Sequence, residues 1–182
     1  MRGRGLLLGR LIWVAVAMLA VGVYVVGIPA YYDQLLTLSP LDGGDPATLR
    51  DNLDEVGLSV GFYAAYGVFT EIVSAAVGFT LAFLIFWRKS DEPIALLVAL
   101  TFAAGVGGSA PLETLAAAHP VLQVTNTVLT FLNTACLILV LYVFRNGRFV
   151  PRWSRWFALA LIALTVPNFF FPSSPLNWGR WP

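Results

Sequence analysis

One acidic side chain lies in the middle of a long apolar segment. Glu71 is about a dozen residues into the segment 60–87, and Gly67, Ser74 and Gly78 share its helical face at steps of four, three and four. An ionised carboxylate away from water is costly, so Glu71 is expected to face the protein interior, to have a partner or to stay protonated. This placement predicts a ligand site, a proton site or a switch element.

A second set of polar side chains recurs at helical spacing. Gln123, Asn126, Thr130 and Asn133 are separated by three, four and three residues, which places them on one face of a helix. Counted inward from the outer ends of the expected spans, Thr101 and Asn133 lie at a depth similar to that of Glu71. We therefore predict an interior polar cluster of Glu71, Thr101, Thr130 and Asn133, with Asn126 and Gln123 nearer the outer surface. The alternative is that these side chains only form hydrogen bonds that hold helices together.

The sequence predicts no catalytic or metal centre. His119 is the only histidine, and Cys136 is the only cysteine. One histidine cannot supply a zinc or bis-histidine haem site, although it could ligate a chlorophyll magnesium or sense pH, or simply be a solvated loop residue. Glycine-rich phosphate loops and nucleophile–histidine pairs are not evident, so we expect no cofactor and no enzyme activity.

Arginines and a tryptophan cluster near residue 150. Asn146-Gly147 is a turn signal within this stretch. Arginine beside tryptophan is typical of a membrane boundary, where cations meet anionic lipid and indole rings lie in the interface. The sequence predicts a cytoplasmic lipid anchor here, with a partner-binding role as the alternative. The residues are Arg145, Arg148, Arg152, Trp153 and Arg155.

The elements that position these residues are too apolar for a soluble fold. Hydrophobic residues make up 58% of the 182-residue chain, charged residues 12%, and mean hydropathy is +0.78, outside the globular range. The sequence predicts an all-α membrane protein, one transmembrane domain over 1–182 with a bundle of about five helices, each roughly 17–27 residues long. The spans are expected at about 11–28, 60–87, 93–110, 122–144 and 156–172, the last one ending early or kinking at Pro167.

The positions of the basic residues predict the orientation. Every Lys and Arg except Arg50 and Arg180 falls on one side of a five-span arrangement. The positive-inside rule makes that side cytoplasmic, which gives a cytoplasmic N-terminus and an external C-terminus in a cell inner membrane. A net charge of +1 gives no strongly basic surface for nucleic acid. The expected partners are the lipid bilayer and other membrane chains or a second copy.

The external loop 29–59 is the only sizeable segment outside the expected spans. Asp45 followed by Pro46 is a helix-start signal, with Asp45 at the N-cap and Pro46 in the first turn. We expect a short amphipathic helix at about 46–56, which places Leu49, Leu53 and Val56 on one face.

Several strings together resemble a known family. They are GIPAYY at 27–32, GFYAAY at 61–66, FWRKSDEP at 86–93, ALLV at 95–98, GRFVPRW at 147–153 and PSSPLN at 172–177. In this order they resemble the N-terminal multi-pass membrane region of bacterial sensor histidine kinases of the competence-kinase type. Where that family often reads Pro-Asp-Gly, this chain has Arg145-Asn146-Gly147. The phosphoacceptor and ATP-binding motifs are lacking, so the resemblance implies a sensory module without kinase activity, either a fragment or a truncated relative.

Three functions remain open at this point. The first is a sensory, signal-transducing membrane module of a two-component system. The second is an accessory structural subunit of a larger membrane complex, respiratory or photosynthetic. The third is a small transporter or channel, which the lack of an internal repeat disfavours.

Overall fold

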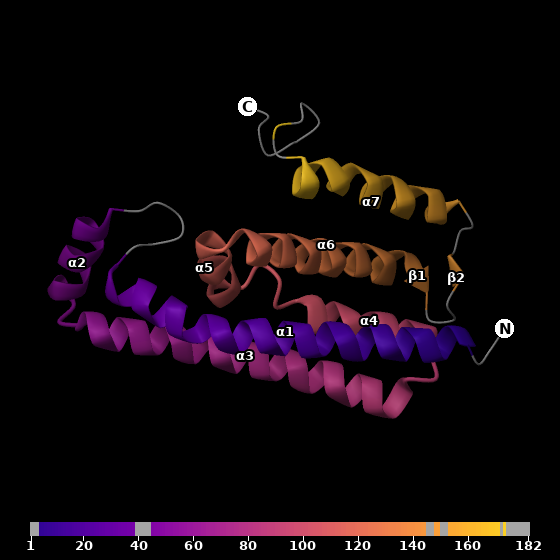
Figure 1. Cartoon of the computed structure of the whole chain (residues 1–182), viewed down its shortest axis with the longest axis horizontal. Coiled ribbons are helices and arrows are strands. Elements are labelled where there is room, and N and C mark those ends of the chain that lie inside the picture. The colour runs from indigo at the N-terminus through magenta and orange to yellow at the C-terminus, as the bar shows by residue number, and fades with distance from the viewer. Residues whose placement is uncertain (1–3, 39–44, 145–147, 150–152, 172, 174–182) are drawn as a thin grey trace.

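The computed structural model describes residues 4–38, 45–144, 148–149, 153–171 and 173. Over these residues the chain is helical apart from one short hairpin, and the long helices lie side by side (Figure 1). The helices are α1 (Arg4–Leu36), α2 (Pro46–Glu55), α3 (Val60–Lys89), α4 (Pro93–Ala104), α5 (Ala110–Ala118), α6 (Pro120–Tyr142) and α7 (Ser154–Phe170). The hairpin strands are β1 (Val143–Phe144) and β2 (Arg148–Phe149).

Three of the described helices, α1, α3 and α6, are long and apolar enough to cross a membrane. Their surfaces agree with a lipid environment, because many of their large apolar side chains are exposed. The other two expected spans are shorter, since α4 has 12 residues and α7 has 17. The helix α7 continues through Pro167 to Phe170.

The segment before α3 matches the predicted helix start. Asp45 accepts a hydrogen bond from the Ala47 backbone N–H at 3.1 Å and from the Thr48 hydroxyl at 3.0 Å, which caps α2. Leu53 is buried, whereas Val56 follows the helix and is exposed. Ser59 caps α3 in the same way, accepting from the Phe62 N–H at 3.2 Å.

The span expected over 93–110 is not one helix, which corrects the sequence-based prediction. α4 ends at Ala104, an irregular stretch covers 105–109, and α5 begins at Ala110. Glycines at 105, 107 and 108 explain the break, since glycine is a poor helix former and Gly108 has a positive φ of 77°. In Figure 1, α5 does not follow the direction of the long helices.

The break is packed closely between α1 and α6. A Cβ on Gly107 would lie 2.5 Å from the Thr130 backbone nitrogen of α6, and one on Gly27 of α1 would lie 2.5 Å from the Pro111 carbonyl oxygen of α5. Asn126 of α6 accepts a hydrogen bond from the Gly108 N–H through Oδ1 at 3.0 Å. Irregular backbone buried among helices needs such partners, because lipid offers none.

The core consists of two clusters along α1. One contains Ala20, Tyr24, Val106, Leu112 and Leu129, and thus joins the break to α1 and α6. The other contains Trp13, Ala82, Ala99 and Ala103 near the N-terminal end of α1. Trp13 stacks on Phe86 of α3 with ring centroids 3.9 Å apart. Small alanines let the helices approach closely in this second cluster.

Candidate functional site

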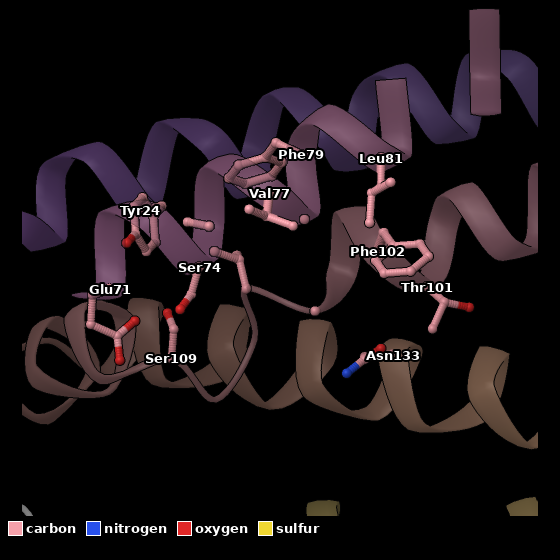
Figure 2. Close-up of a pocket in the computed structure, with 14 residues that line it drawn as sticks. Tyr24, Glu71, Ser74, Val77, Phe79, Leu81, Thr101, Phe102, Ser109 and Asn133 are labelled. Atoms are coloured by element: carbon pink, nitrogen blue, oxygen red, sulfur yellow. The ribbon is translucent and has the colours of Figure 1, made fainter. Parts of the chain in front are cut away.

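A cavity of about 430 Å³ lies where α4 breaks, between α1, α3, α4 and α6. Its polar lining comes from four helices and the break: Tyr24, Glu71, Ser74, Thr101, Ser109 and Asn133. Its apolar lining includes Val77, Phe79, Leu81, Phe102 and Val106. Figure 2 shows Glu71, Ser74, Ser109 and Tyr24 grouped at one end, with Thr101 and Asn133 further along.

Glu71 is half-buried and lies about 16 Å along α3 from its first residue, at 1.5 Å per residue. Its carboxylate makes no hydrogen bond or ion pair with a described residue. The described residues that line the cavity include no Lys, Arg or His. The cavity therefore carries one acidic group with unused acceptor capacity.

Two hydroxyl groups beside Glu71 also have no partner among the described residues. The Tyr24 hydroxyl and Ser109 Oγ are both buried without a hydrogen bond. Tyr24 is only 5% exposed. Ser109 precedes α5 at the N-cap position, yet its side chain makes no capping bond. Buried polar atoms are nearly always satisfied, so this end of the cavity has room for an additional polar group.

The structure places the predicted polar cluster partly around this cavity. Glu71, Thr101 and Asn133 all line it, although Figure 2 shows Asn133 beside Thr101 rather than beside Glu71. The Thr101 hydroxyl donates to the Leu97 carbonyl oxygen at 3.0 Å. Thr101 is therefore tied back to its own helix.

Two of the remaining stripe residues, Asn126 and Thr130, lie against the break and are not part of the described cavity lining. Thr130 donates its hydroxyl hydrogen to the Asn126 carbonyl oxygen at 2.8 Å, and Asn126 Oδ1 accepts from Gly108. Gln123, at the outer end of the stripe, is exposed. For Asn126 the contact matches the structural alternative, in which polar side chains fasten helical segments together, whereas the Thr130 hydroxyl is bonded within α6.

Sequence reasoning missed Tyr24 and Ser109 as cavity residues. Tyr24 lies in an apolar run of α1, where a single tyrosine gives no periodic signal. Three glycines within 105–108, followed by a serine and Pro111, were the available signal for the break. That signal is weak, because glycines are also frequent within continuous membrane helices.

The arginine-rich stretch is described only in part. Arg145 and Arg152 lie outside the described residues, and Arg148 belongs to β2, which pairs with β1 through Phe144. Trp153 is exposed, and the Arg155 guanidinium lies 5.1 Å from the Trp156 ring centroid. Such a cation–π pair at the start of α7 is compatible with an interfacial anchor.

His119 and Cys136 add no second centre within the described ranges. His119 is exposed in the short link between α5 and α6, and Cys136 is buried in α6. Among the described residues, no group of three or more His, Cys, Asp or Glu could hold a metal ion. The cavity can bind through charge and hydrogen bonds, and its described lining contains no nucleophile–base pair.

No family model, no curated protein and no solved structure matches this chain.

Proposed function

We propose that the chain is a non-catalytic sensory module of a cell inner membrane, resembling the membrane region of a two-component sensor kinase. It has five spans in this proposal, with α4, the break and α5 acting together as one discontinuous span. The distribution of Lys and Arg supports a cytoplasmic N-terminus and an external C-terminus. Three apolar helices of sufficient length support the membrane location.

The observation that carries the proposal is the contact between the cavity and the helix break. Val106 and Ser109 of the break line the cavity, and Val106 also packs with Tyr24 and Leu129 in the core. A ligand that engages this end of the cavity therefore touches a segment held by turn hydrogen bonds and by Asn126, and not by the regular bonds of a helix. Signalling follows if the ligand binds two arrangements of the break with different affinity.

The coupling route runs along α1 and α4 to their cytoplasmic ends. The helices α1 and α4 pack against each other, and each of them also packs against α3. At that end Arg10 forms an ion pair with Asp91, next to the stacked Trp13 and Phe86. A shift of α4 at the break would change these contacts, because packed helices move as rigid elements.

Distances between spin labels in the reconstituted protein test the proposal. Labels replace Leu8 on α1 and Leu141 on α6, both strongly exposed near the proposed cytoplasmic ends of their helices. We expect Glu71→Gln, which removes the cavity's charge, to shift the distance distribution. Glu55→Gln, the same change on exposed α2, should leave the distribution as in the wild type. Identical distributions in all three proteins would reject a switching role for Glu71.

A second candidate, an accessory subunit of a larger complex, is favoured by one face of α3. Phe62, Tyr66 and Phe69 follow each other at helical spacing and are all exposed. Aromatic side chains on one face suit a neighbouring transmembrane helix as well as lipid. Extraction in mild detergent followed by native sizing separates the candidates, since stoichiometric migration with a large complex favours the subunit.

A further inference from the structure

We propose that the cavity at the helix break binds a small organic ammonium ion with an apolar body. Its charged nitrogen lies at the end formed by Glu71, Ser109 and Tyr24. This inference rests on the proposed function, since it names the ligand class of the same site.

The charge of the cavity selects a cation over an anion. Glu71 is the one charged side chain in the described part of its lining. The first turn of α5 lies nearby and contributes a partial positive charge of roughly half an elementary charge. A bound cation favours the ionised form of Glu71, and that full charge outweighs the partial charge of the helix. An anionic ligand would meet Glu71 without any basic partner among the described lining residues.

The hydrogen-bonding groups suit an ammonium in particular. An ammonium only donates hydrogen bonds, so it needs oxygen acceptors around it. Glu71 offers two carboxylate oxygens, and the hydroxyls of Tyr24 and Ser109 are buried with no partner in the described part of the chain. Figure 2 shows these groups and Ser74 facing the same space. Tyr24 is more than nine-tenths buried, so its hydroxyl finds a partner only inside the protein.

The rest of the lining suits an apolar body and argues against a bare metal ion. Phe79, Phe102 and Leu81 line the cavity beyond the polar end. A volume of about 430 Å³ falls in the usual range for small-molecule sites. Metal cations instead need several oxygen ligands at about 2.0–2.6 Å, in a tight cage. No group of three or more His, Cys, Asp or Glu in the described ranges meets that need.

Binding of 2-phenylethylamine to the purified full chain in lipid nanodiscs tests the inference. The neutral analogue 2-phenylethanol has nearly the same shape but lacks the charge, and sodium chloride serves as the inorganic cation. Dissociation constants come from isothermal titration at pH 7. The variants are Glu71→Gln and, as the matched control on exposed α2, Glu55→Gln.

We expect the amine to bind the wild type at least about tenfold more tightly than the alcohol, because charge-assisted hydrogen bonds are the stronger ones. Glu71→Gln should remove this preference, and Glu55→Gln should keep it. The comparison of amine with alcohol in the wild type needs no variant, so poor folding of Glu71→Gln leaves a decisive measurement.

Three outcomes overturn the inference. Equal affinity for the amine and the alcohol would mean that the cavity recognises only the apolar shape of its ligand. Binding of sodium at millimolar concentration, with no binding of the amine, means that the cavity is an inorganic cation site. Amine binding that Glu71→Gln leaves unchanged means a different location. If instead the amine binds as expected and the spin-label distances stay fixed, the ligand class stands and the sensory function fails.

Discussion

Two serines at helix N-caps differ in what their hydroxyls do. Ser59 accepts a hydrogen bond from the Phe62 N–H, whereas the Ser109 side-chain oxygen is buried with no partner among the described residues. A capping bond stabilises a helix, and an unsatisfied hydroxyl costs free energy wherever it is buried.

Alanine at each position should therefore have different effects on stability. Ser59→Ala is expected to lower the free energy of unfolding by about 1 kcal/mol. Ser109→Ala should leave it unchanged or raise it slightly, because an orphan hydroxyl is removed. Thermal unfolding of both variants in one detergent provides the measurement. A loss at Ser109 as large as that at Ser59 would mean that its hydroxyl has a structural partner.

Asp45 makes the cap of α2 depend on pH. Hydrogen bonds from the Ala47 backbone N–H and the Thr48 hydroxyl lower the pKa of the Asp45 carboxyl below its usual value. Because the folded pKa is depressed, the stabilisation is present above the unfolded pKa and is lost as pH falls through the folded pKa.

We expect hydrogen exchange at the α2 amides to accelerate, after correction for intrinsic rates, as the buffer is acidified below pH 4. Asp45→Asn should keep the capping oxygen but lose this pH dependence, since an amide does not titrate there. If both proteins respond to acid alike, another group controls α2.

At the scale of elements, the helix break depends on two close approaches. Gly107 contacts the α6 backbone, and Gly27 contacts Pro111 of α5. Neither glycine has a positive φ, so space and not conformation requires a small residue.

Gly107→Ala should destabilise the bundle by about 1–3 kcal/mol, because its Cβ meets backbone atoms that cannot rotate away. Gly22→Ala in α1 is the matched control, since a Cβ there meets nothing within 4 Å. We expect that control to change stability by less than about 1 kcal/mol. Unfolding in graded denaturing detergent compares the two variants. Equal stability would show that α6 yields easily at the break.

Hydrophobic runs predicted most of the helices, while local backbone chemistry decided the rest. The apolar segments at 60–87 and 122–144 correspond to α3 and α6, and the Asp45-Pro46 signal marks the start of α2. The break at 105–109 was not predicted, because the three glycines within 105–108 lie inside an apolar run whose length indicates a continuous span. Glu71 was evident from its charge, whereas Tyr24 reaches the cavity only through the packing of α1.

At the scale of the whole molecule, the orientation of the termini is open to direct measurement. Cys136 is buried, and replacing it with serine gives a background for single cysteines. Asp54, Trp153 and Ser173 are exposed and fall, respectively, before α3, before α7 and after α7.

With an impermeant maleimide on sealed right-side-out vesicles, Asp54→Cys and Ser173→Cys should react at once. Trp153→Cys should react only after the vesicles are permeabilised. This pattern follows from five spans with the basic side in the cytoplasm. Protection of Ser173→Cys in sealed vesicles would mean that α7 does not cross the bilayer. The proposed number of membrane spans would then be lower than five.

The stacked pair of Trp13 and Phe86 provides an intrinsic fluorescence probe of helix packing. Their rings, 3.9 Å apart, join the N-terminal part of α1 to the C-terminal part of α3, and Trp13 is 8% exposed. Trp87, Trp153 and Trp156 are exposed, so an aqueous or lipid-soluble quencher reaches them first. The emission that survives quenching reports chiefly on Trp13 among the described tryptophans. Separation of the two helix ends would therefore register as a change in fluorescence lifetime, without any attached dye.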